Sequence, residues 1–232
     1  MKTPASADAK ADQRPTNRVE LSLLVGSIGF FLCLGLGYAV IGGFAWRTVH
    51  LLDEKIIRLW REMGPPDWLV GGAINLTALG SAIVLGILSF VLSGYLALHG
   101  RWRSASLVLV VFGGAYALNG GLKATFDRAR PDVSLHLTQV HSPSFPSGHA
   151  AASAAVYIGL ATGLARQTQR RREKFYFFAI ALSLVVTIGL TRVFLGVHYP
   201  SDVLVGWTIG ALWAAVPWAV YRLVSPWLQK PK

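Results

Sequence analysis

The sequence has few charged residues and almost no cysteine. Charged residues make up 14% of its 232 residues, whereas an average globular chain has about 25%. The single cysteine, Cys33, lies within an apolar run, which excludes a disulfide framework inside one chain. Hydrophobic residues, by contrast, make up 53% of the sequence. These proportions argue against a soluble domain and favour an integral membrane protein.

Long stretches with almost no acidic or basic residues predict where the chain crosses a bilayer. A spanning helix needs about 20 apolar residues. Six segments meet this requirement, at residues 21–44, 74–98, 104–122, 148–165, 174–191 and 201–222. We therefore expect an all-α, polytopic membrane protein whose six-helix bundle occupies residues 19–232. Residues 1–18 are polar and lack apolar periodicity, which predicts a disordered cytoplasmic tail.

The basic residues indicate how this bundle lies in the membrane. The net charge of +11 would suggest nucleic-acid binding in a soluble chain, but here the cations lie between apolar segments. With six crossings, 14 Lys and Arg residues fall on one side and 8 on the other. The positive-inside rule then places both termini in the cytoplasm, as in a multi-pass protein of a bacterial-type inner membrane. The bilayer is the expected partner, nucleic acid is not, and the oligomeric state stays open.

One segment between the first two crossings is amphipathic. Leu52, Ile56, Leu59 and Met63 recur at helical spacing in residues 51–63, with charges on the opposite side. Such a helix would lie in the headgroup plane. It could shape an entrance for lipid or serve as a surface brace.

Three clusters of polar residues adjoin the predicted crossings, all on the extracytoplasmic side. An ionisable residue beside hydrocarbon is costly and indicates a functional site. The clusters are Lys123 with Arg130-Pro131, Pro146-Ser147-Gly148-His149, and Arg192 with His198 and Asp202. Together they supply the cations, histidines and carboxylate needed to hold a phosphate and break its ester bond without a metal.

Each cluster has its own chemistry. Arg130 can donate two hydrogen bonds to a phosphate at once, and Lys123 adds a compact charge. Ser147 is a natural N-cap, and Gly148 lets an anion approach the free N–H groups of a helix start. That helix start would place His149 beside the anion as a general acid.

The third cluster has the orienting logic of a catalytic triad. His198 and Asp202 are four residues apart across a predicted helix start. A carboxylate that accepts from one ring nitrogen fixes the tautomer and leaves the other nitrogen free to attack. Arg192 precedes this pair by six residues and can add a third cation.

The three motifs, in this order, closely resemble the type 2 phosphatidic acid phosphatase family. The pattern is Lys-x6-Arg-Pro, Pro-Ser-Gly-His and Ser-Arg-x5-His-x3-Asp, and Thr191 stands where the family has Ser. The resemblance implies a membrane lipid phosphatase in which His198 forms a phosphohistidine, Asp202 orients His198, and His149 protonates the leaving oxygen. Lys123, Arg130, Ser147, Gly148 and Arg192 would bind the phosphate. It implies no cofactor and no metal.

Several alternatives stay open at this point. The substrate could be undecaprenyl pyrophosphate, phosphatidylglycerol phosphate, phosphatidic acid, diacylglycerol pyrophosphate or lipid A 1-phosphate. The same histidine could pass the phosphoryl group to a second lipid, as in a phosphotransferase, and vanadium haloperoxidases share a similar site on soluble folds. His136 and His141 could join His149 around a metal, although their spacing fits no strong zinc pattern. We also expect Asp127 to pair with Arg128, and Asp132 to orient Arg130.

Overall fold

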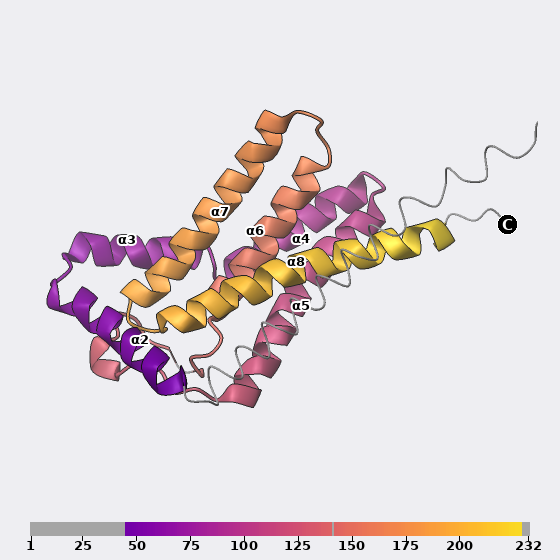
Figure 1. The fold of residues 1–232 in the computed structure, drawn as a ribbon. Coiled ribbons are helices and arrows are strands. Elements are labelled where there is room, and N and C mark those ends of the chain that lie inside the picture. Colours follow the sequence, from indigo (N-terminus) through magenta and orange to yellow (C-terminus); the bar gives the residue numbers. More distant parts are fainter. Residues whose placement is uncertain (1–44, 141, 229–232) are drawn as a thin grey trace, which may run out of the picture.

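A computed structural model describes residues 45–140 and 142–228 of the chain. Within these ranges the regular structure is entirely helical (Figure 1). The elements are α2 (Ala45–Glu62), α3 (Asp67–Ala78), α4 (Ala82–Leu98), α5 (Trp102–Phe126), the short 3-10 helix η2 (Val133–Leu135), α6 (Gly148–Ala165), α7 (Arg171–Phe194) and α8 (Pro200–Leu228). The predicted tail, the crossing at 21–44 and Cys33 lie outside the described residues.

Helix α6 is the centre of the bundle. It packs against α4, α5, α7 and α8, and five of its first nine residues are alanines, all of them buried. Small residues let membrane helices approach closely. On α8, a Cβ at Gly210 would lie 2.1 Å from the carbonyl oxygen of Ala151, so only glycine permits this contact. The bounds of α6 agree with the predicted crossing at 148–165.

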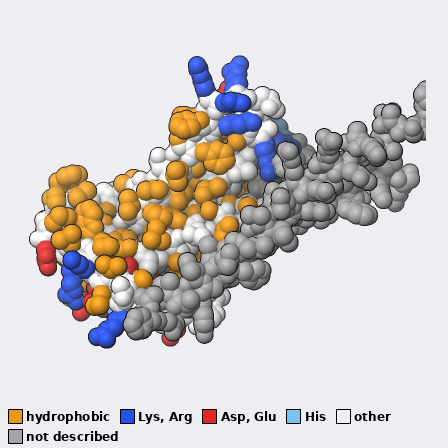
Figure 2. Space-filling view, viewed as in Figure 1, with side chains coloured by type: hydrophobic (Ala, Val, Ile, Leu, Met, Phe, Trp, Pro, Cys, Tyr) orange, Lys and Arg blue, Asp and Glu red, His pale blue; other side chains and the backbone are white. Residues whose placement is uncertain are grey.

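The outer surface is largely apolar. Hydrophobic side chains spread over one face of the molecule, and Lys and Arg gather toward its two ends (Figure 2). Ile83, Phe90, Phe175 and Leu182 are each more than half exposed. Of the described helices, α5, α6 and α7 are long and apolar enough to cross a membrane, and the bent pair α3–α4 adds a fourth candidate. The arrangement with six crossings stays a prediction.

The predicted second crossing, 74–98, is not one helix. The chain instead forms α3 and α4, which are bent by 40° at a short break. Ser81 caps α4 by accepting a hydrogen bond from the Val84 N–H, and a Cβ at Gly80 would lie 2.5 Å from Ile188 on α7. The close approach of α7 and the serine cap thus interrupt a run that composition alone reads as continuous. The break leaves Thr77 buried at the end of α3.

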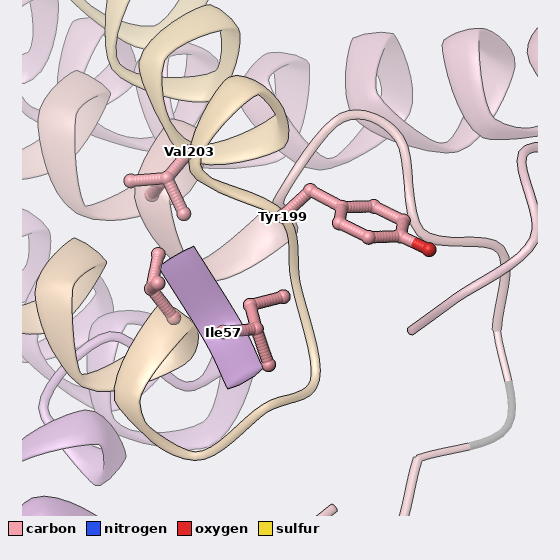
Figure 3. Close-up of a cluster of buried hydrophobic side chains, with 5 residues drawn as sticks. Ile57, Tyr199 and Val203 are labelled. Carbon is pink, nitrogen blue, oxygen red and sulfur yellow. The ribbon is translucent and has the colours of Figure 1, made fainter. Parts of the chain in front are cut away.

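The amphipathic segment is helical, as predicted, but α2 begins at Ala45, six residues before the predicted start. The predicted apolar side is exposed: Leu52 and Leu59 are both 57% exposed. A different side packs on the bundle, where Ile57 is 1% exposed and contacts Tyr199 and Val203 at the start of α8 (Figure 3).

The candidate residues gather at one end of the bundle. There α5 and α7 end, α6 and α8 begin, and the connection 127–147 lies between α5 and α6. The third crossing was predicted to stop at residue 122, but α5 continues to Phe126, so Lys123 lies in its last turn.

Candidate functional site

His198 lies in the short connection between α7 and α8, and Asp202 lies in the first turn of α8. Pro200 begins this helix, in agreement with the predicted helix start. His198 is 2% exposed and Asp202 is fully buried. The His198 Nδ1 atom lies 3.5 Å from the Asp202 Oδ2 atom, which is longer than an ordinary hydrogen bond. Burial lowers the pKa of His198 and Asp202 partly offsets this, so the imidazole is neutral near pH 7.

Arg130 determines which ring nitrogen of His198 carries the proton. The Arg130 Nη1 atom lies 3.3 Å from the His198 Nε2 atom. Because a guanidinium can only donate, Nε2 must accept, and the ring proton belongs on Nδ1, which faces Asp202. Arg130 itself is held by the carbonyl oxygens of Ser142 (2.6 Å from Nε) and Val197. Nε2 is therefore the unprotonated ring nitrogen of His198, and its lone pair faces Arg130.

The prediction that Asp132 orients Arg130 is wrong. Asp132 Oδ1 accepts a hydrogen bond of 2.8 Å from the Ser134 N–H and caps η2. An Asp side chain that can bond its own backbone two residues onward commonly does so in turns.

The predicted pair of Asp127 and Arg128 does not form either. Asp127 ends α5 in the left-handed conformation and is exposed. Arg128 is 7% exposed and contacts Asp202 and Asp53, the latter at 3.0 Å. The helix end turns the two neighbouring side chains in different directions, so Arg128 points into the bundle.

Asp202 has more partners than the sequence suggests. Its Oδ2 atom accepts hydrogen bonds from Ser144 Oγ (2.5 Å) and from the Tyr199 N–H (2.9 Å), and its Oδ1 atom accepts from Arg128. Sequence reasoning missed Arg128 and Ser144 as partners of Asp202, and Asp53 as the second partner of Arg128. The sequence held no signal for Asp53, because the packed side of α2, where Ile57 lies one turn away, is not the apolar side that the spacing predicts.

The second motif begins α6, as predicted, but Ser147 does not cap the helix with its side chain. Its Oγ atom is buried and has no hydrogen-bond partner among the described residues. The Ser147 N–H donates to the Asp202 carbonyl at 3.1 Å, which ties the start of α6 to the start of α8. A Cβ at Gly148 would lie 3.0 Å from Asn119 Nδ2, so a larger residue would crowd α5. Asn119 is a further buried residue that the sequence reasoning did not identify.

Lys123 and Arg192 are the other two cations of the site, beside Arg130. The Lys123 Nζ atom donates to Ser142 Oγ (3.3 Å) and to the Pro143 carbonyl. Arg192 is 4% exposed and donates to Thr77 Oγ1 at 3.3 Å, while its Nε atom has no partner within the described chain. Lys123, Arg130, Arg192 and His198 all act electrostatically on His149, so the three predicted clusters share one site.

The other histidines contribute differently. The His136 Nε2 atom lies 3.0 Å from the Pro131 carbonyl oxygen, which requires Nε2 to donate. Burial lowers the pKa of His136, in agreement with a neutral ring. His141 lies outside the described residues. Nothing in the described ranges brings three or more His, Cys, Asp or Glu side chains together as metal ligands.

The site is suited to a tetrahedral anion. Three cations converge at the start of a helix whose first N–H groups have no intrahelical partners, and such helix ends attract phosphate. Ser147 Oγ and Arg192 Nε are buried donors that a bound oxyanion could satisfy. His198 Nε2 faces Arg130, one of these cations.

Comparison with known proteins decides the family. Residues 104–225, just over half of the chain, match the sequence model of the PAP2 superfamily. The chain belongs to the PAP2 superfamily. The matched range contains all eight candidate residues and helices α6 and α7 in full.

Relatives within the PAP2 superfamily are named as phosphatases. Phosphatidylglycerophosphatase B of Bacillus subtilis (strain 168) is 35% identical over 167 residues, which cover 72% of this chain and 81% of the relative. Lipid A 1-phosphatase of Rhizobium johnstonii is 35% identical over 158 residues, which cover 64% of this chain and 59% of the relative.

A solved structure has the same fold. The crystal structure of a transmembrane PAP2 type phosphatidylglycerolphosphate phosphatase from Bacillus subtilis has a TM-score of 0.75 and 30% identity, with 86% of this chain and 96% of that chain covered. The apolar helices and the bacterial relatives together indicate a bacterial membrane protein and a hydrolase of the phosphatase class.

Proposed function

We propose that this PAP2 protein hydrolyses the terminal phosphate of a membrane lipid phosphate through a phosphohistidine on His198. One observation carries the proposal. The His198 Nε2 atom accepts from Arg130, and Nδ1 faces the buried Asp202 carboxylate. A neutral imidazole whose Nδ1–H faces a carboxylate, and whose Nε2 lone pair faces a phosphate-binding arginine, can act as a nucleophile on phosphorus.

In the first step, the Nε2 lone pair forms a bond to phosphorus as the bond from phosphorus to the lipid oxygen breaks. His149, protonated once the phosphate anion is bound, gives its proton to that oxygen, and the lipid leaves as an alcohol, or as a lipid monophosphate when the substrate is a pyrophosphate. The positive charge that develops on the His198 ring is stabilised by Asp202 through Nδ1–H. Lys123, Arg130 and Arg192 stabilise the negative charge on the three phosphoryl oxygens, with help from Ser147 Oγ and the Gly148 N–H.

In the second step, water attacks the phosphohistidine. Neutral His149 takes one proton from this water as the new oxygen–phosphorus bond forms and the nitrogen–phosphorus bond breaks. Inorganic phosphate leaves, and both histidines return to their starting protonation states. Transfer to the hydroxyl of a second lipid would use the same intermediate, with an alcohol in place of the water.

The substrate class follows from where the site lies and from the relatives. The residues of the site come from the ends of membrane helices, so a lipid tail can stay in the bilayer while the phosphate enters between the helix ends. Phosphatidylglycerol phosphate is the first substrate to test, because the relative of that activity aligns over 81% of its own length. Lipid A 1-phosphate, undecaprenyl pyrophosphate and phosphatidic acid complete the panel.

The decisive assay is phosphate release by the purified protein in detergent. The wild-type chain should release inorganic phosphate from at least one lipid of the panel, and His198→Ala should release none while keeping its melting temperature. His99→Ala is the matched control, because His99 is exposed and its ring hydrogen-bonds only the Tyr95 carbonyl among the described residues. A His198→Ala variant with near-normal turnover would exclude the mechanism. If the substrate phosphate is labelled and the label appears only on a second lipid, the reaction is phosphoryl transfer and not hydrolysis.

We further propose six crossings, cytoplasmic termini and a site on the extracytoplasmic face. The excess of basic residues on the side of the termini supports this orientation. The test replaces Cys33 by Ser and introduces Cys at Ala129, beside the site, or at Gln169, at the other end of the bundle; both positions are exposed. An impermeant thiol reagent added to intact cells should label Cys at 129 and not at 169. Labelling of Cys at 169 and not at 129 would show that the orientation in the membrane is the opposite of the proposed one.

A further inference from the structure

A buried ion network lies behind Asp202, on the side away from the phosphate-binding cations. Its centre is Arg128, whose Nη1 atom donates to Asp202 Oδ1 and to Ser201 Oγ (2.8 Å). The other terminal nitrogen, Nη2, donates to Asp53 Oδ2 at 3.0 Å. The two carboxylates and the guanidinium are each less than 10% exposed. A single arginine thus joins α2 to the first turn of α8.

Asp53 also holds the main chain next to Asp202. Its Oδ1 atom accepts from the Ser201 N–H at 3.0 Å, and its Oδ2 atom accepts from Ser201 Oγ at 2.5 Å. Asp53 is 3% exposed on a helix that is otherwise mostly exposed. One turn later, Ile57 packs against Tyr199 and Val203, which fixes this part of α2 on the start of α8 (Figure 3).

The network bears directly on the geometry of His198. A fully buried carboxylate is costly unless a cation or several hydrogen bonds compensate its charge. The neutral His198 ring does not supply that charge, and Arg130 contacts the opposite side of the ring. Arg128 does supply it, and its planar group is fixed over the Tyr199 ring at 4.2 Å. The Asp202 oxygen that faces Nδ1 is bonded directly by Ser144 and the Tyr199 N–H, and Arg128 and Asp53 hold the same carboxylate through its other oxygen.

We propose that Asp53 and Arg128 are positioning residues for the reaction, which hold Asp202 so that His198 keeps its proton on Nδ1. The inference rests on the proposed function of His198 and assigns no phosphate contact to either residue. It makes α2 part of the reaction machinery, although α2 lies outside the three motifs and outside the matched range 104–225.

Two substitutions test this network. Asp53→Asn keeps the shape of the side chain but removes its charge, and Arg128→Lys keeps the charge but loses the fork that reaches both carboxylates. We expect kcat to fall about 10–100-fold in each, the range seen when outer partners of a metal-ligating histidine are removed. KM should stay within about 2-fold of wild type, since neither residue binds the phosphate. Glu62→Gln, which removes an exposed carboxylate from the same helix, should change neither constant.

A double-mutant cycle separates positioning from simple stabilisation. If Asp53 acts through Asp202, Asp53→Asn should lower kcat by less than about 2-fold in an Asp202→Asn background. An equal loss in both backgrounds, or a folded Asp53→Asn protein with wild-type kcat, would overturn the inference. Ser201→Ala perturbs the same network more gently and is measured in the same cycle, so the result can be read even where Asp53→Asn fails to fold.

The two proposals fail in different ways. A wild-type chain that releases no phosphate from any lipid, or a His198→Ala variant that stays active, would exclude the proposed function. An active wild type and an inactive His198→Ala, together with a normal Asp53→Asn, would exclude only the role of the network.

Discussion

Replacing Asp202 by Asn tests the centre of the proposed mechanism with the smallest change in shape. The Oδ1 atom of Asp202 faces the Arg128 guanidinium, which can only donate. The Tyr199 N–H at the Oδ2 position also can only donate, but a charged guanidinium bonds an oxygen more strongly than a neutral N–H does, so the asparagine oxygen should take the Oδ1 position. Its NH2 group then takes the place of Oδ2, where it faces the Tyr199 N–H and the His198 Nδ1 atom.

This arrangement changes the tautomer of His198. The new NH2 group donates toward Nδ1, which must become the acceptor, so the ring proton moves to Nε2 and the nucleophilic lone pair is lost. In a triad whose buried carboxylate has the same role, the equivalent change lowers kcat by about 10⁴-fold. This factor corresponds to an increase in the activation free energy of about 5 kcal/mol. KM should change little, because Asp202 does not touch the phosphate in the proposed mechanism.

Stability must be measured beside activity. Removing one partner of a buried ion pair typically lowers the free energy of unfolding by about 3–5 kcal/mol. We expect a loss near the lower end of this range, because Arg128 still has Asp53 as an ionic partner. Asp127→Asn is the matched control: the same change at an exposed, left-handed position that asparagine tolerates well. Phosphate release and thermal unfolding of both variants are compared in the same detergent. A folded Asp202→Asn protein with kcat within tenfold of wild type would refute the orienting role of Asp202.

Two further predictions concern the His198 region. Burial lowers the pKa of His198 below the ordinary histidine value of 6.5, so the ring becomes protonated only at a lower pH. The acid limb of kcat/KM, measured from pH 4 to 9, should therefore have its midpoint below pH 6.5. Asp202 raises this pKa, whereas Arg130 and Arg192 lower it, so the acid limb should move further down in Asp202→Asn; an upward shift would contradict the assigned contacts. Gly196→Ala should lower thermal stability more than Gly100→Ala, because both glycines have φ near +70° but only at Gly196 would a Cβ meet a carbonyl oxygen, that of Leu135 at 2.1 Å. The left-handed conformation alone costs about 1–2 kcal/mol for a residue with a Cβ, so equal losses would show that the contact with Leu135 relaxes.

Much of the fold follows from charge-free runs, because a bilayer requires every backbone group to bond within its own helix. The segment 148–165 was predicted with its observed bounds, since Ser147-Gly148 and the charges after Ala165 mark both ends. The break between α3 and α4 was missed. It depends on Gly80 meeting Ile188, more than a hundred residues away, and no local pattern contains that contact. The same break gives Arg192 its partner Thr77, which sequence spacing could not reveal.

The candidate site also contains residues that the sequence predicts and residues that it does not. Residues that face a phosphate recur in short motifs, because one anion fixes their chemistry and their spacing on a helix end. Residues that hold those groups from behind follow no such rule. Asp53 reaches Arg128 across 75 positions, and Arg128 reaches Asp202 across 74, through contacts that exist only after α2 docks on α8. Asp53 sits on the buried side of a helix whose apolar side faces outward, which is the reverse of a soluble amphipathic helix. In a membrane protein, a charged residue on the packed side of such a helix therefore points to an ionic partner in the site, and Asp53 provides the case in which to test it.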